Sequence, residues 1–243
     1  KILFVTLDGL GGVLGPEPTA LQRATIPNLD GLASESALGR SIQIADGITP
    51  GSGPGHFSVF GYDPLAVNVG RGLLEAMGVG VDVQPGDVAL RGNLCTVDGE
   101  GKLSDRRAGR IATELAAPII KQLNDGIGQI EDVQVEVHAG LQYRFAAVFR
   151  GPSLHPAVAD TDPQATGVPP LPARAVEPAA EKMARIADLF AARAREILGE
   201  RDVANSVLLR GFSGRPPIPT YAEMARLRSC AIAAYPAYRG VAR

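Results

Sequence analysis

A serine flanked by glycine and proline is the residue of this sequence best placed to do chemistry. Ser52 lies in the stretch GSGPGH, where glycine tolerates positive φ and proline fixes φ. The pattern predicts a sharp turn that lifts the hydroxyl clear of its neighbours, before an apolar run at residues 57–60 returns the chain to a core. Serine is a weak nucleophile unless a neighbouring group activates it, so the site needs an activating partner.

An aspartate at the end of the first predicted strand is the candidate activator. Residues 1–7 (KILFVTL) form a short apolar run, which predicts a strand buried on both faces as in a parallel sheet. Asp8 follows at its carboxyl end, where open α/β sheets bind ligands, although Asp-Gly is also a common turn. If Asp8 and Ser52 meet at one sheet edge, a divalent metal on Asp8 could favour the serine alkoxide. His56 reaches back to Ser52 only if a helix begins there, and otherwise serves the fold or a substrate contact.

Arginines beside glycines form a second group. Guanidinium groups suit the bidentate recognition of phosphate or carboxylate. On spacing alone a solvated surface explains seven such arginines better than a binding site does, but their predicted position beside glycines and in loops, rather than on helix faces, favours binding. The group comprises Arg106, Arg107 and Arg110 after Asp105, Arg144 and Arg150 around one predicted strand, and Arg210 and Arg215 around a glycine loop. The nearby stretch Asp160-Thr161-Asp162-Pro163 is either a metal site or an Asx-type turn, and the turn is favoured.

Composition restricts the class of protein. The 243 residues are 45% hydrophobic and 21% charged, with a net charge of −2, which suits a globular protein of one or two domains. The near-neutral charge argues against nucleic acid or an acidic membrane as the main partner, and no apolar run reaches the roughly 18 residues of a membrane span. Cys95 and Cys230 lie far apart and are expected to be buried thiols of a cytoplasmic protein.

The remaining elements follow from periodicity and turn residues. Besides residues 1–7, strands are predicted at residues 38–45, 88–97, 133–137, 143–149, 207–209 and 230–234, the third and fourth of these six as an antiparallel pair. Helices are predicted at residues 26–33 with Asn28 or Asp30 as cap, at 73–77, at 111–123 with a break or bend near Pro118, and at 179–198. The type of predicted elements changes near residues 86 and 226, from those of a parallel sheet to a mixture of strands and helices and back. This predicts an α/β fold with a mixed α+β domain inserted at residues 86–225.

Ten motifs in order resemble one family. They include VTLDGLGG, TIPNLDGLA, PGSGPGHFSVFGYDP, NVGRGLLEAMGVG, PGDVALRGNLCTVD, DRRAGRI, ADTDP, LLRGFSGRPPIP and AAYPAYRGVAR. Over nearly its whole length the chain resembles the archaeal-type cofactor-independent phosphoglycerate mutases of the alkaline phosphatase superfamily. The resemblance implies a mainly parallel, alkaline-phosphatase-like sheet flanked by helices. Residues 1–85 and 226–243 would belong to this metal-binding domain, and residues 86–225 would be the inserted transferase domain.

The resemblance also implies roles for particular residues. Ser52 would be the phosphorylated nucleophile and a metal ligand, and Asp8 would bind one of two divalent metal ions, either Mn, Mg, Zn or Co. The substrate, phosphoglycerate, would be held by Asp105, Arg106, Arg144, Arg210 and Arg215, with His56 close by. A metal-bound serine would take the phosphoryl group of 3-phosphoglycerate and return it to the 2-hydroxyl of glycerate, a step of glycolysis and gluconeogenesis.

The sequence departs from the family in its metal ligands. The remaining aspartate and histidine ligands of the family follow the inserted domain, whereas this sequence has only three histidines, His56, His138 and His155, and none lies in such a pattern. The chain also starts without Met. We therefore expect a fragment of a longer protein that is inactive by itself.

Three other functions compete with that of a phosphoglycerate mutase. The first is a related metal-dependent phosphomutase or phosphohydrolase acting on another substrate. The second is an inactive paralogue that binds an anion through its arginines. A serine hydrolase is the weakest, because Ser52 does not lie in a G-x-S-x-G motif. Neither the metal's identity nor the oligomeric state follows from the sequence.

Overall fold

The computed structural model describes residues 1–7, 9–67 and 69–243, apart from the side chain of Ser52. Asp8, the predicted metal ligand, therefore lies outside the described residues. The chain divides into two compact units, Lys1–Ile42 and Gln43–Arg243, and each is described by itself. The domain boundaries at residues 86 and 226 stay a prediction.

The first unit contains two short helices, α1 (Ala20–Arg23) and α2 (Pro27–Ser34). The helix predicted at residues 26–33 is confirmed as α2. Its start is set by Pro27, whose fixed φ suits the first helical turn, and no side chain caps it. The predicted caps Asn28 and Asp30 are therefore wrong.

The parallel strands predicted at residues 1–7 and 38–45 do not form. Ile2 and Leu3 are 82% and 88% exposed, and neither segment has strand structure at its described residues. A buried parallel strand needs hydrogen-bonded neighbours at both edges and covered faces. No described apolar side chain of the first unit is buried, so these runs have no core to enter.

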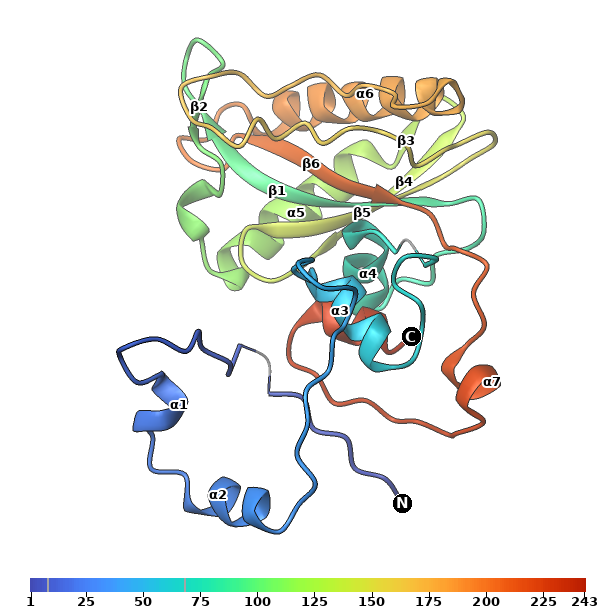
Figure 1. Cartoon of the computed structure of the whole chain (residues 1–243). Coiled ribbons are helices and arrows are strands. Elements are labelled where there is room, and N and C mark those ends of the chain that lie inside the picture. Colours follow the sequence, from blue (N-terminus) through green and yellow to red (C-terminus); the bar gives the residue numbers. More distant parts are fainter. Residues whose placement is uncertain (8, 68) are drawn as a thin grey trace. The chain divides into compact units, whose positions relative to one another are not determined.

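An antiparallel sheet dominates the second unit (Figure 1). Its strands are β1 (Val88–Val97), β2 (Leu103–Asp105), β3 (Gln129–Ile130), β4 (Val133–Ala139), β5 (Arg144–Arg150) and β6 (Ser206–Ser213). β1 is central, because it pairs with β5 on one side, with β6 on the other, and with β2 at its end. β5 continues to β4 and then β3. Every pairing among the described residues is antiparallel, so the fold is a mixed helix and antiparallel-sheet structure, without the predicted parallel sheet.

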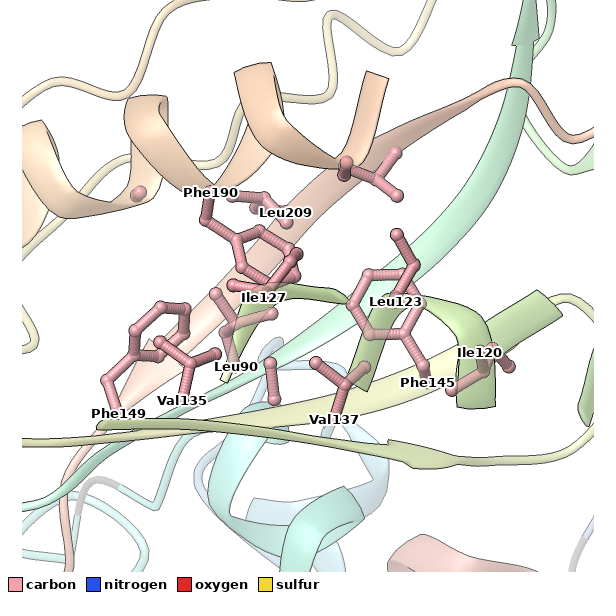
Figure 2. Packing of buried hydrophobic residues seen from close by; sticks show 14 of the residues in the cluster. Leu90, Ile120, Leu123, Ile127, Val135, Val137, Phe145, Phe149, Phe190 and Leu209 are labelled. Atoms are coloured by element: carbon pink, nitrogen blue, oxygen red, sulfur yellow. The ribbon is translucent and has the colours of Figure 1, made fainter. Parts of the chain in front are cut away.

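Two amphipathic helices cover one face of this sheet. α5 (Thr113–Ile127) and α6 (Glu181–Leu198) pack their buried residues against β1, β4, β5 and β6 (Figure 2). The ring of Phe190 lies 5.6 Å from that of Phe149 and 6.3 Å from that of Phe145. Short 3₁₀ turns, η1 (Ala108–Arg110) and η2 (Pro178–Ala180), precede the two helices. Helix α5 runs through Pro118 and buries residues of one face beyond it, so the helix is not broken there, and the alternative of a bend stays a prediction.

The opposite face of the sheet carries a second, smaller core. α4 (Arg71–Gly78) packs there, with α3 (Ser52–Val59) and α8 (Pro236–Val241) beside it (Figure 1). Two glycines let α4 and α8 touch backbone to backbone. A Cβ at Gly78 would lie 1.8 Å from the carbonyl oxygen of Pro236, and one at Gly240 would lie 1.9 Å from that of Leu74. Any side chain at either position would force the helices apart.

The C-terminal part of the second unit departs most from the predictions. β6 extends to Ser213, so Arg210 lies in a strand instead of the predicted loop. The strand predicted at residues 230–234 does not form. This segment is largely exposed, and it pairs with no strand of the described sheet. α7 (Tyr221–Ala225), held by a capping box at Thr220, precedes it.

The two cysteines differ in environment. Cys95 is buried in β1, and burial raises the pKa of its thiol to about 12. Cys230 is exposed, so its predicted burial is wrong. Among the described residues, no helix combines the length and the apolar character that a membrane crossing requires.

Candidate functional site

The sheet face beneath α4 is apolar at one end and polar at the other. Ala89 and Val148 belong to the core that α4 covers. Because alternate residues of a strand share a face, Arg91 and Asn93 of β1 lie on the same face as Ala89. Strand β1 therefore carries a basic and a polar side chain directly after its apolar, helix-covered part.

Neighbouring strands add two more arginines to this face. Arg91 lies opposite Arg210 of β6, and Asn93 lies opposite Arg144 of β5. Residues opposite each other in an antiparallel ladder share a face, with Cβ atoms roughly 5 Å apart. Three arginines and an asparagine from three adjacent strands thus form one group, defined here as the arginine face: Arg91, Asn93, Arg144 and Arg210.

A bulge sets the position of Arg210. The register between β1 and β6 shifts between Ala89 and Arg91, and Gly211 has the left-handed φ of 62° that such a bulge favours. The backbone N–H of Gly211 donates to Oδ1 of Asp160 at 2.8 Å. Bulges of this kind commonly redirect a side chain beside a binding site.

Two carboxylates of the ADTDP motif orient two arginines. Arg106 donates from Nε and Nη2 to the two oxygens of Asp162, at 2.7 and 2.8 Å. Arg210 pairs through Nη1 with Asp162 at 3.3 Å, and through Nε with Asp160 at 3.2 Å. Asp162 thus brings Arg106 to the arginine face. Its side chain is 1% exposed, so this is a buried, shared ion pair.

The charge of Asp162 is maintained despite burial. Burial by itself would raise the pKa of this carboxyl, but the hydrogen bonds from Arg106 and from the Gln164 backbone, with the charge of Arg210, hold its pKa below the usual value. The bond from the Gln164 N–H closes the predicted Asx turn at 2.9 Å. The turn is therefore present, and its carboxylate also fixes the arginines.

Aromatic rings surround Arg144. Its guanidinium lies 5.0 Å from the centre of the Tyr143 ring and 5.8 Å from that of Tyr235, distances at which a cation interacts favourably with a ring face. Nη2 also donates to the Tyr143 hydroxyl at 3.3 Å. Tyr235 directly precedes α8, so that helix helps to position the arginine face.

Arg91 and Asn93 of this face, and Glu75 beside it, have buried side-chain atoms that lack a hydrogen-bond partner among the described residues. These atoms are both carboxyl oxygens of Glu75, Nε of Arg91 and Oδ1 of Asn93. Burial raises the pKa of Glu75, while the charges of Arg91 and Arg144 act in the opposite direction. Burial likewise lowers the pKa of Arg91.

A helix begins at Ser52, and this is the condition under which His56 was predicted to reach back towards that residue. α3 starts at Ser52, with Gly51 as N-cap, so His56 follows one turn later on the same side of the helix. The His56 ring stacks on Tyr238 of α8, with ring centres 4.5 Å apart. Gly53 is buried, and a Cβ there would lie 3.0 Å from Leu74 Cδ1, so α3 packs closely on α4.

Two of the predicted substrate contacts have other partners. Asp105 accepts the N–H groups of Arg107 and Gly109, each at 2.7 Å, and so closes the turn that follows β2. Arg215 donates to the Val83 carbonyl at 3.2 Å. Arg215 follows the end of β6, five positions after Arg210. The structure therefore brings Arg106, Arg144 and Arg210 to one region, and the roles of Asp105 and Arg215 stay predictions.

The described residues offer little to a metal. Among residues 1–7, 9–67 and 69–243, no three His, Cys, Asp or Glu side chains are grouped so that they could hold an ion. Asp8 and the side chain of Ser52 lie outside the description. The two-metal site therefore stays a prediction, and the described side chains do not fit it.

The sequence reasoning missed Glu75, Arg91 and Asn93. Each carried a signal, since Glu75 interrupts an apolar helix and the other two interrupt a buried strand. Buried polar side chains in such elements are uncommon unless they have a partner or a function.

Comparison with known proteins assigns the family. Residues 33–204 match the model of a family described as 2,3-bisphosphoglycerate-independent phosphoglycerate mutase. The chain belongs to this family. The chain is also similar to a Thermus thermophilus protein named a probable 2,3-bisphosphoglycerate-independent phosphoglycerate mutase, with 50% identity over all of this chain and 60% of that protein's length.

Further relatives agree with this assignment. An Aquifex aeolicus protein with the same name is 48% identical over all of this chain and 61% of its own length. A solved cofactor-independent phosphoglycerate mutase from Thermoplasma acidophilum is 28% identical, with a TM-score of 0.63, over 79% of this chain and 54% of that one. The chain thus spans about 60% of the length of the curated relatives it matches.

Proposed function

We propose that the chain is the substrate-binding part of a mutase that interconverts 3-phosphoglycerate and 2-phosphoglycerate. The observation that carries the proposal is the arginine face, joined by Arg106 through the shared Asp162. Phosphoglycerate has a phosphate and a carboxylate, and clustered guanidinium groups bind both. The family assignment supports the same ligand, since its relatives are named as phosphoglycerate mutases.

The ion pairs with Asp162 and Asp160 leave donors for a ligand. Arg106 uses Nε and Nη2, and Arg210 uses Nε and Nη1. Within the described part of the chain, neither Nη1 of Arg106 nor Nη2 of Arg210 has a hydrogen-bond partner, so both can donate to a phosphate. Because the carboxylates hold both guanidinium groups in place, little side-chain entropy is lost when the ligand binds.

The proposed chemistry uses Ser52 as a phosphoryl carrier. The serine oxygen bonds to phosphorus as the bond between phosphorus and O3 breaks, and the serine proton ends on O3 of glycerate. In the second half, O2 of glycerate attacks the phosphoserine, and its proton returns to the serine. The first-turn N–H groups of α3, which begins at Ser52, favour the phosphoserine charge because a helix N-terminus is positively polarised.

The arginines would also favour phosphoryl transfer to glycerate over hydrolysis of the phosphoserine. Glycerate must stay bound while its 2-hydroxyl replaces its 3-hydroxyl at phosphorus, or water will take the phosphoryl group. Arg144, enclosed by Tyr143 and Tyr235, is suited to retain the carboxylate. Since the described side chains do not fit a metal, no step is assigned to one.

The proposal extends to the domains. Residues 86–225 contain all six strands and would be the transferase domain. Residues 1–85 and 226–243 would belong to an alkaline-phosphatase-like domain of a cytoplasmic enzyme. The parallel strands that residues 1–7 require as neighbours would come from the remaining 40% or so of the relatives' length.

Calorimetric titration of the 243-residue chain tests the ligand class. We expect 3-phosphoglycerate to bind at least tenfold more tightly than glucose 6-phosphate, because only the former has a carboxylate for Arg144. Equal affinity would favour a related phosphomutase or phosphohydrolase of another substrate. Binding of neither ligand would contradict the proposed function.

Turnover by this chain alone is a separate question. We expect no interconversion of 3- and 2-phosphoglycerate with added Mn²⁺ and without bisphosphoglycerate, since no three His, Cys, Asp or Glu side chains among the described residues are grouped so that they could hold an ion. An enzyme-coupled assay for 2-phosphoglycerate measures it. Sustained turnover would show that the expected inactivity is wrong and would leave the ligand assignment intact.

A further inference from the structure

A proline-rich segment between β5 and α6 takes no part in the arginine face. Residues 168–174 (VPPLPAR) contain three prolines, and each position from Val168 to Pro172 is a proline or directly precedes one. Proline fixes φ at about −65°, and the residue before it is restricted to extended conformations. Residues 169–174 accordingly contain no helix, strand, turn or bend. The sequence therefore favours a polyproline II conformation in this segment.

The exposure of this segment repeats every third residue. Pro170 and Ala173 are half-buried, and Ala173 packs against the main apolar core. Because a polyproline II helix has about three residues per turn, these two side chains lie on one inward ridge. The two remaining ridges point outward, and their members are all exposed: Val168, Pro169, Leu171, Pro172 and Arg174.

Inward hydrogen bonds hold the segment against the fold. The N–H of Leu171 donates to the Thr161 carbonyl at 2.9 Å, and that of Ala173 donates to Oδ1 of Asp188, on α6, at 2.7 Å. Both bonds lie on the side of the segment that faces the fold. The outward ridges are therefore fixed before any partner arrives, and little chain entropy is lost when one binds.

The outward side of the segment offers hydrogen-bond acceptors and apolar ridges. Proline has no N–H, so another strand cannot extend a regular ladder along this segment. Among the residues that the structure describes, none donates a hydrogen bond to the carbonyl groups of residues 169–172, and none pairs with the Arg174 guanidinium. A partner must therefore supply hydrogen-bond donors, apolar hollows and a negative charge.

We propose that residues 168–174 are a docking surface for a protein module whose aromatic-lined groove binds proline-rich segments. Val168-Pro169 and Leu171-Pro172 each fill one hollow between aromatic rings of the groove. Indole and phenol groups of these rings donate to the carbonyl groups of the segment. An acidic side chain at the end of the groove pairs with Arg174. This surface does not depend on the proposed function.

A second copy of this chain is a poor occupant of the surface. A groove that binds proline needs exposed aromatic rings. The chain has no tryptophan, and each of its five tyrosines is buried or half-buried. The surface is therefore assigned to a different protein.

An SH3 domain that has a groove tryptophan and prefers a basic residue after the second proline is the probe. Because the 243-residue chain contains no tryptophan, the fluorescence of that groove tryptophan reports binding without background. We expect a saturable change when the chain is added, reversed by a proline-rich peptide that occupies the groove. An absent change, or one that the peptide does not reverse, would overturn the proposal.

Variants of the outward ridges locate the contact. Leu171→Ala and Arg174→Gln should each weaken binding of the SH3 domain by at least about tenfold, the effect of losing a buried apolar side chain or a charged hydrogen bond. Val176→Ala is the matched control, since Val176 is 61% exposed but lies beyond Arg174. It should change the affinity by less than about twofold. Unchanged binding in the first two variants, or equal losses in all three, would contradict the proposed surface. Far-UV circular dichroism establishes that each variant is folded.

Sedimentation of the chain by itself tests the other occupant. We expect Leu171→Ala to sediment as the unaltered chain does. If the unaltered chain self-associates and Leu171→Ala does not, a second copy covers the ridges, and the proposal of a separate aromatic-grooved partner is overturned.

Discussion

Replacing Asp162 by asparagine is expected to lower the free energy of unfolding by about 3–5 kcal/mol, the usual effect of breaking a buried ion pair from one side. Asp162 is the shared partner of Arg106 and Arg210, and its side chain is 1% exposed. The substitution keeps the size of the side chain but leaves Arg106 without its carboxylate partner and Arg210 with Asp160 alone. Chemical denaturation followed by circular dichroism measures the loss.

The pH dependence of stability identifies the cause of this loss. The folded-state pKa of Asp162 is lowered from 3.8, so its contribution is present above pH 3.8 and disappears as pH falls through the folded value. The stabilities of the two proteins should therefore converge in acid. Asp125→Asn is the control, because Asp125 forms an exposed pair with Lys121, worth at most about 0.5 kcal/mol. A similar, small effect of both substitutions would contradict the network.

Replacing Gly240 by alanine is expected to displace helix α8 and to lower the free energy of unfolding by about 3 kcal/mol, at the upper end for overpacking. The added Cβ would lie 1.9 Å from the Leu74 carbonyl oxygen, and a backbone atom cannot turn away as a side chain can. Displacement would separate Tyr235 from Arg144 and Tyr238 from His56. The substitution should therefore also weaken phosphoglycerate binding, although Gly240 is not a ligand contact.

A second glycine provides the comparison for Gly240. Gly99 lies in the exposed turn between β1 and β2, and a Cβ there would meet nothing within 4 Å. Gly99→Ala should change the stability by less than about 0.5 kcal/mol, as is usual for surface substitutions. If Gly240→Ala changed the free energy of unfolding as little as Gly99→Ala, the close packing of α4 on α8 would be wrong.

The sequence predicted the antiparallel elements better than the parallel ones. Strict alternation at residues 133–137 and partial alternation at residues 143–149 identified β4 and β5, because alternation of apolar and polar residues is a local signature of a strand. The apolar runs at residues 1–7 and 230–234 have the composition of strands, but a strand needs partners that local sequence does not reveal. Pro118 predicted a break or a bend, yet α5 continues through it, because burying the apolar face of the helix outweighs one missing hydrogen bond.

The sequence predicted which types of residue form the site, but not which of these residues form ion pairs with one another. The group of seven arginines contained Arg106, Arg144 and Arg210, and the family resemblance selected these three together with Asp105 and Arg215. The shared carboxylate of Asp162 joins segments 56 residues apart in sequence, and only the folded sheet brings them together. Arg91 and Asn93 were missed because the sequence predicts a strand at residues 88–97 without its neighbours, and the register of β1 with β5 and β6 reveals the face that these two residues share.

The central claim is that the arginine face binds phosphoglycerate, and titration of 3-phosphoglycerate into arginine variants tests it most directly. Arg106→Gln and Arg210→Gln should each weaken binding by at least about tenfold, the effect of losing a charged hydrogen bond. Each variant leaves Asp162 with one remaining arginine. Arg193→Gln, on α6 at the opposite side of the sheet and bonded to the Gln129 carbonyl, should bind as the unaltered chain does. Binding that is unchanged in Arg106→Gln and Arg210→Gln would contradict the account.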